Sequence, residues 1–136
     1  DHHERAVSAG GILVKQAPNN IDAINNLAWL IQDKDPMRAQ ALLSHALKLS
    51  PNSAHAADTL GWLKLQRKDI PGALALLSRA HQMQPANPTI TYHLIVALDA
   101  GTKRGEALTL LKPLLSGGAQ FADRPEAQRL YATWLR

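Results

Sequence analysis

The chain has 136 residues, of which 46% are hydrophobic and 19% are charged, and its formal net charge is +4. This length is enough for one domain of ordinary size. Because the chain has no cysteine, disulfide bonds, thiolate zinc sites and cysteine nucleophiles are excluded. Alanine and leucine supply 22 residues each, whereas valine and isoleucine together supply only 10, so the composition predicts an all-α protein.

Three prolines mark an internal repeat. Pro18, Pro51 and Pro85 lie 33 and 34 residues apart, each at the end of an apolar helical stretch and before a residue suited to begin a new helix. Each period predicts two helices joined by a tight turn, and Pro36 and Pro71 fit the first turn of a helix. In chain order the first helices are expected at 20–32, 54–67 and 88–100, and the second helices at 36–49, 70–84 and 104–115.

Both ends of the chain predict a further helix. Leu13 and Pro18 repeat the offsets of a second helix, so residues 1–18 suggest half of a repeat, from an array cut out of a longer one. Gly10 and Gly11 weaken that helix by about 1 kcal/mol per glycine relative to alanine. At the other end, Asp123 to Glu126 predict a capping box that opens a final helix, whose apolar stripe covers the last repeat.

The period and its small and large positions resemble those of the tetratricopeptide repeat (TPR), a helix–turn–helix unit. Gly61 and Ala73 are small where two helices must approach closely, and Leu60 and Leu77 fill the space beside them. The resemblance implies an all-α, right-handed superhelical solenoid with a C-terminal capping helix. It implies one TPR domain over residues 1–136, with a partial repeat at 1–18, repeats at 20–53 and 54–87, an irregular repeat at 88–116 and a capping helix at 123–135.

In the TPR family the first helix of each repeat lines a concave groove, and the partners are usually peptides or helices of other proteins. The chaperone-binding members use lysine, arginine and asparagine there to hold a terminal carboxylate. This chain has acidic and neutral residues at those places, so that ligand is not expected. The resemblance places twelve residues in the groove: Asp22, Asn25, Trp29, Gln32, His55, Asp58, Trp62, Gln66, Thr89, Tyr92, His93 and Val96.

Trp29 and Trp62 occupy equivalent positions in two repeats and allow two interpretations. They could form an exposed ladder with Tyr92 that stacks on a peptide or on sugar rings, or they could pack between adjacent repeats as part of the core. His55 and Asp58 are spaced as two metal ligands would be on one helix face. Because a third ligand is lacking, no metal and no cofactor are expected.

The function predicted from these features is a non-enzymatic scaffold that binds a partner protein segment in the groove. The sequence has no phosphate-binding glycine loop, no nucleophile elbow and no HExxH motif, so an enzyme is not expected. Its paired basic residues are scattered at turns, so nucleic-acid binding is not expected either. Two alternatives stay open: a carbohydrate-associated module with an aromatic ladder, and a purely structural spacer.

Three stretches that begin at Asn25, Asp58 and Tyr92 resemble the C-terminal repeats of bacterial TPR proteins tied to exopolysaccharide. Among these are lipoproteins of the exosortase (PEP-CTERM) system. This second resemblance implies a periplasmic or membrane-anchored scaffold, with components of polysaccharide assembly or protein sorting as partners. The chain has no apolar run of the roughly 18 residues that a membrane span requires. The amino-terminal half-repeat also suggests a homodimer that covers its apolar face.

Overall fold

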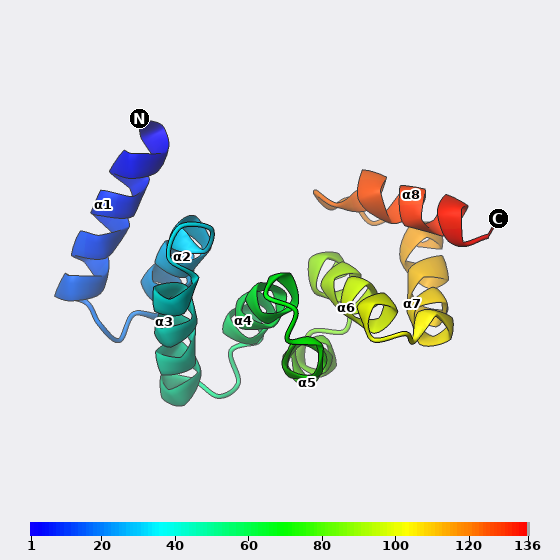
Figure 1. The fold of residues 1–136 in the computed structure, drawn as a ribbon, viewed down its shortest axis with the longest axis horizontal. Coiled ribbons are helices and arrows are strands. Elements are labelled where there is room, and N and C mark those ends of the chain that lie inside the picture. The colour runs from blue at the N-terminus through cyan, green and yellow to red at the C-terminus, as the bar shows by residue number, and fades with distance from the viewer. Residues whose placement is uncertain (136) are drawn as a thin grey trace.

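The computed structural model describes residues 1–135 and is all-helical (Figure 1). Arg136, the last residue of the expected domain, lies outside the described residues. Within 1–135 there are eight helices, and none of them is long and apolar enough to cross a membrane. They are α1 (His2–Gln16), α2 (Ile21–Ile31), α3 (Pro36–Leu49), α4 (Ala54–Gln66), α5 (Ile70–Met83), α6 (Pro88–Ala100), α7 (Arg104–Ser116) and α8 (Arg124–Trp134).

Polar caps start the helices where the sequence predicts them. The side chains of Asn20, Ser53 and Asn87 accept hydrogen bonds from the first free backbone amides of α2, α4 and α6. Asp35 and Asp69 do the same for α3 and α5, which carry proline in their first turn. Because these caps satisfy amides that have no partner within the helix, they fix the point at which each helix begins. The boundaries of α2 to α7 lie within one residue of the predicted ranges.

Small residues allow the paired helices to approach each other closely. A Cβ on Gly61 of α4 would lie 2.7 Å from Cγ of Leu77 on α5, so the two helices meet where residue 61 has no side chain. Leu43, Leu77 and Leu111 occupy equivalent positions on α3, α5 and α7, and at most 1% of each is exposed. The core is therefore a row of leucines between the paired helices.

The helix pairs follow one another along the long axis of the molecule (Figure 1). Each of α1 to α7 packs against the next helix in the chain, and α2 and α6 also contact α4 directly. The three first helices therefore lie side by side and form one continuous surface. This arrangement is that of a helical solenoid.

α8 lies across the carboxyl end of the array, over α6 and α7 in Figure 1. Ala127 of α8 is buried in the cluster that holds Leu98 of α6 and Leu111 of α7. The turn before α8 is fixed by Arg124, whose two terminal nitrogens donate to the carbonyl oxygens of Ala119 at 2.7 Å and Leu115 at 2.8 Å. The helix thus covers the apolar side of the last helix pair.

The predicted capping box at Asp123 is wrong. The Asp123 side chain makes no cap hydrogen bond to the backbone of α8. Its carboxylate instead lies 4.0 Å from Nε2 of His93 on α6. The aspartate is therefore turned toward the surface of the first helices, and Arg124 rather than a cap holds the entry to α8.

At the amino end, α1 continues without a break through Gly10 and Gly11. A Cβ on Gly10 would lie 3.3 Å from Cδ1 of Leu27, so this glycine permits close contact between α1 and α2. Leu13 is 53% exposed, unlike Ala46 and Ala80, which occupy the equivalent positions five residues before Pro51 and Pro85 and are buried. In residues 1–135 the main contact of α1 is with α2, and Ile12 and Leu13 of α1 are both more than half exposed.

Candidate partner-binding groove

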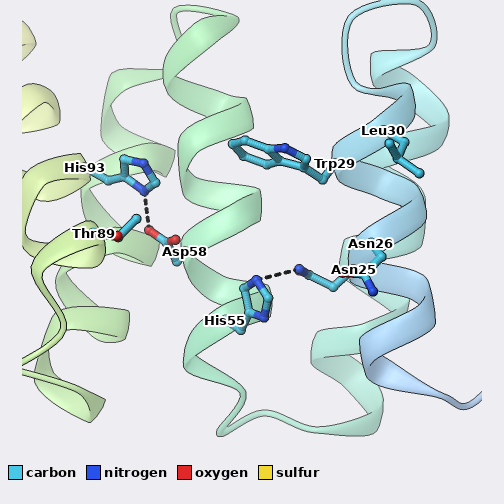
Figure 2. A pocket seen from close by; sticks show the side chains of 8 residues that line it. All are labelled: Asn25, Asn26, Trp29, Leu30, His55, Asp58, Thr89 and His93. Carbon is cyan, nitrogen blue, oxygen red and sulfur yellow. Dashed lines mark hydrogen bonds and ion pairs between the residues drawn. The ribbon is translucent and has the colours of Figure 1, made fainter. Parts of the chain in front are cut away.

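A pocket of about 430 Å³ lies on the surface formed by α2, α4 and α6 (Figure 2). A second space of about 360 Å³ between α4 and α6 shares His55, Asp58 and Thr89 with it, so the two form one continuous groove. We call the first space the groove pocket. It is lined by Asn25, Asn26, Trp29 and Leu30 from α2, His55 and Asp58 from α4, and Thr89 and His93 from α6.

Asn25 contributes a buried amide to the groove pocket. Only 3% of the residue is exposed, and its Nδ2 lies 2.8 Å from Nε2 of His55. Since an amide nitrogen is a hydrogen-bond donor, Nε2 of His55 accepts this hydrogen bond. The Oδ1 atom of Asn25 is buried without a hydrogen-bond partner. An unpaired buried oxygen costs about 1–3 kcal/mol, so Asn25 holds an unsatisfied acceptor in the wall of the groove pocket.

Trp29 is the exposed aromatic residue of the groove pocket. Its side chain is 47% exposed and reaches from α2 toward α4 (Figure 2). One end of α2 is closed by Gln32, whose Nε2 donates to the carbonyl oxygen of Trp29 at 3.1 Å. A half-exposed indole beside a buried amide gives the pocket an apolar face and a directional polar group, which is the usual composition of a binding site.

His93 forms the opposite wall of the groove pocket and is held from three sides. Its Nδ1 donates to Oδ1 of Asp58 at 2.7 Å, and both side chains are buried (Figure 2). The indole of Trp62 stacks on the imidazole with 4.2 Å between ring centroids. The other ring nitrogen of His93, Nε2, lies 4.0 Å from the carboxylate of Asp123. These contacts join α4, α6 and the segment before α8 into one wall.

Tyr92 lies beneath the segment before α8 and not in the groove pocket. The residue is 8% exposed, and its ring centroid is 6.4 Å from that of Phe121. Burial raises the pKa of the Tyr92 phenol above its ordinary value of 10.0, and the carboxylates of Asp123 and Glu126 raise it further, opposed by Arg129. The groove is therefore closed over this part of α6.

Replacing Tyr92 by phenylalanine is expected to make the protein more resistant to alkaline unfolding. The folded protein keeps the phenol neutral, whereas the unfolded chain ionises it at the ordinary pKa of 10.0. The stability contributed by neutral Tyr92 is therefore complete below about pH 10 and is lost as the pH rises through the folded pKa. The measurement is urea unfolding of both proteins at about pH 8 and about pH 11. A difference in unfolding free energy that stays constant over this range would contradict the expectation.

The structure brings together half of the twelve residues that the resemblance places in the groove: Asn25, Trp29, His55, Asp58, Thr89 and His93. The other six do not line the groove pocket. Asp22 and Gln66 are exposed outside it, Gln32 closes the end of α2, and Trp62, Tyr92 and Val96 pack against the core.

The two tryptophans do not share one environment. Trp29 is exposed, whereas Trp62 is covered by His93 and packs against the core. Tyr92 is covered as well. The interpretation as a ladder of three displayed aromatic rings is therefore wrong, and the interpretation as core packing holds only for Trp62.

Sequence reasoning missed three residues of the site. Asn26 and Leu30 line the groove pocket, and Asp123 faces His93. The signal for the first two was available, since they lie four residues apart on α2 and flank Trp29 on the same face. No local signal marks Asp123, because its partner lies on another helix.

The structure gives no metal centre in its described part. Within residues 1–135 no group of three or more histidine, aspartate or glutamate side chains is placed to hold a metal ion. His55, which was a candidate ligand with Asp58, is bonded to Asn25, while Asp58 is bonded to His93.

A sequence model of the tetratricopeptide repeat matches residues 64–133, which is more than half of the chain. The chain belongs to the tetratricopeptide repeat family. The match runs from α4 to α8, so the TPR pattern extends into the helix that covers the end of the array. TPR proteins are generally non-enzymatic scaffolds for protein–protein interaction.

Solved TPR structures share the fold of this chain. The crystal structure of MamA superposes with a TM-score of 0.72 at 23% identity, over 84% of this chain and 67% of MamA. YrrB, described as a TPR protein with an unusual peptide-binding site, gives 0.76 at 17% identity, over 96% of this chain and 66% of YrrB. At these identities the likeness concerns the fold alone, and the chain spans about two thirds of either protein. Comparison with curated protein sequences finds no significant match.

Proposed function

We propose that this TPR chain is a non-enzymatic scaffold that binds a segment of a partner protein in the groove pocket. The observation that carries the proposal is the exposed indole of Trp29 beside the unpaired, buried Oδ1 of Asn25. Aromatic residues at the centre of an interface supply much of the binding energy, and a buried acceptor fixes the direction of the bound segment. A segment that donates a hydrogen bond to Asn25 would remove the cost of the unpaired oxygen.

The whole chain acts as one TPR domain in this proposal. Repeats at 20–53, 54–87 and 88–116 supply the three first helices, residues 1–18 form a partial repeat, and residues 123–135 form the cap. Direct contact of α2 and α6 with α4 supports this division, because it places one groove helix in each repeat. The cover that α8 forms over α6 limits the proposed binding surface to the part between α2 and His93.

The two alternatives have less support. The role of a purely structural spacer requires neither an exposed tryptophan nor an unpaired buried acceptor, and this chain has both side by side. A carbohydrate-binding ladder needs several displayed rings, and the groove displays Trp29 alone among its three aromatic residues. The idea that the partner belongs to exopolysaccharide assembly or protein sorting rests on the sequence resemblance of three stretches. The likeness to MamA and YrrB does not bear on that idea.

Replacing Trp29 by alanine is expected to abolish partner binding while the melting temperature stays within a few degrees of the original. The indole is half-exposed, so its removal costs the fold little, whereas loss of a central aromatic contact typically costs about 2 kcal/mol or more in binding. Peptides that bind the original protein would be selected from a random library displayed on phage. Their affinities for the original protein and for Trp29→Ala would then be measured by titration calorimetry.

The matched control is Met37→Ala, which removes a large exposed apolar side chain on α3, away from the groove. It is expected to leave peptide binding unchanged. Selected peptides that bind Trp29→Ala as tightly as the original protein would refute the groove pocket as the binding site. Equal loss in both variants would indicate non-specific apolar adsorption, which also contradicts the proposal.

A further inference from the structure

The charges of the molecule are distributed unevenly about the groove. The sequence has 15 lysine and arginine residues, yet α2 and α6 carry none, and α4 carries only Lys64. Lys64 lies in the last turn of α4 and pairs with Asp69 at 3.4 Å. The residues that line the groove pocket and the space beside it include no lysine or arginine. The overall charge of +4 therefore belongs to the second helices, the turns and the ends of the chain.

Two buried side chains of the groove pocket carry oxygens that accept no hydrogen bond within residues 1–135. Oδ1 of Asn25 is buried and unpaired. Asp58 accepts from His93 through Oδ1, and its Oδ2 has no hydrogen bond within residues 1–135. Nε2 of His55 already accepts a hydrogen bond from Asn25. The pocket therefore offers an amide oxygen and a carboxylate oxygen from two different helices, together with the face of Trp29.

We propose that the groove pocket receives the guanidinium group of an arginine in the bound segment. The inference rests on the proposed function and names the chemistry of the partner. A guanidinium donates up to five hydrogen bonds in one plane, so it can serve Asn25 and Asp58 together while it stacks on the indole of Trp29. The chain makes such a stack elsewhere, where the guanidinium of Arg104 lies 5.0 Å from the ring of Trp134.

An arginine fits this pocket better than other side chains do. A lysine ammonium is compact and strongly hydrated, so it gains less from an indole face and from two separated acceptors. A glutamate, an aspartate or a free terminal carboxylate would meet the carboxylate of Asp58 without a lysine or arginine to balance it. An uncharged amide side chain would satisfy Asn25 but would gain nothing from the charge of Asp58.

The test uses four peptides with blocked ends that differ at one central residue: arginine, its uncharged isostere citrulline, lysine or glutamate. The indole N–H of Trp29 and the other amide signals of the full chain are followed by NMR while each peptide is added. The arginine peptide is expected to bind about tenfold more tightly than the citrulline peptide, with the glutamate peptide weakest. Its affinity is expected to fall as salt is added.

Two variants at Asn25 test the acceptor itself. Asn25→Leu is expected to weaken binding of the arginine peptide about tenfold, whereas Asn52→Leu, at an exposed turn position, is expected to leave it unchanged. Asn25→Asp puts a carboxylate at the same place and is expected to strengthen binding of the arginine peptide. This second variant keeps the test decisive if the leucine variant does not fold.

The outcomes separate this inference from the proposed function. Equal affinity for the arginine and citrulline peptides, or tighter binding of the glutamate peptide, would overturn the arginine site. Phage-selected peptides that depend on Trp29 and lack arginine would overturn it as well, while the scaffold function would stand. Both proposals would be overturned if none of the four peptides binds and if no peptide selected on phage depends on Trp29 for binding.

Discussion

Replacing Asp58 by alanine is expected to lower the free energy of unfolding by about 1–3 kcal/mol. The variant leaves Nδ1 of His93 without the acceptor that it contacts at 2.7 Å, and the imidazole is too buried to turn to water instead. The indole of Trp62 stacks on the same ring at 4.2 Å, so any movement of His93 also disturbs the packing of α4 on α6. Against the 5–15 kcal/mol that stabilise most domains, this is a substantial loss.

Urea unfolding of the full chain measures this effect, and two variants control it. Asp58→Asn keeps an oxygen that can accept from His93, so it is expected to lose less stability than Asp58→Ala. Asp33→Ala removes an exposed carboxylate in the turn after α2 and is expected to change little. An unfolding midpoint for Asp58→Ala equal to that of Asp33→Ala would show that the buried pair contributes nothing.

The parts of the fold that the sequence predicted well depend on local chemistry. Prolines cannot donate a backbone hydrogen bond, and aspartate, asparagine and serine side chains cap free amides, so helix ends are determined by a few neighbouring residues. Asn20, Ser53 and Asn87, which follow the three repeat prolines, each cap the next helix. The small residues at helix crossings were equally visible, because at the spacing of the repeat Gly61 corresponds to Ala28 and Ala73 to Ala39, so that a small residue recurs at each position.

The environment of the tryptophans depends instead on the next repeat. Trp62 is covered because His93, one repeat after Thr59, places a ring against it at 4.2 Å. Thr59 is the corresponding residue for Trp29, and its short side chain donates to the carbonyl oxygen of His55 in its own helix at 2.9 Å. Threonine has no ring to cover an indole, so Trp29 stays exposed. Equivalent positions within a repeat therefore do not imply equivalent exposure.

The residues that cover Tyr92 lie still farther away in the sequence. Phe121 and Asp123 lie about 30 residues beyond Tyr92 in the sequence and reach it only because α8 folds back across α6 and α7. The direction in which a cap helix returns is decided by packing and by the bonds that Arg124 makes to carbonyl oxygens, neither of which is marked by a motif. The extent of the groove could therefore be determined only from the folded chain.

Replacing Gly61 by valine is expected to lower the free energy of unfolding by about 1–3 kcal/mol. A Cβ at this position would lie 2.7 Å from Cγ and 3.0 Å from Cδ2 of Leu77, closer than packed carbon atoms allow. Leu77 is fully buried among core residues, so it cannot turn away into solvent. Helix propensity alone would favour valine slightly over glycine, so any loss measures the steric conflict between α4 and α5.

The control for Gly61→Val is Gly105→Val in the first turn of α7, where an added Cβ meets no atom within 4 Å and stability is expected to change little. The conflict can also be isolated with a double-mutant cycle. Leu77→Ala alone is expected to cost about 2–5 kcal/mol because it leaves a cavity. In the double variant the valine occupies part of that space, so the combined loss is expected to be clearly smaller than the two single losses added together. Additive losses in urea unfolding would show that residues 61 and 77 do not compete for one space, and that the close approach of α4 and α5 does not depend on glycine.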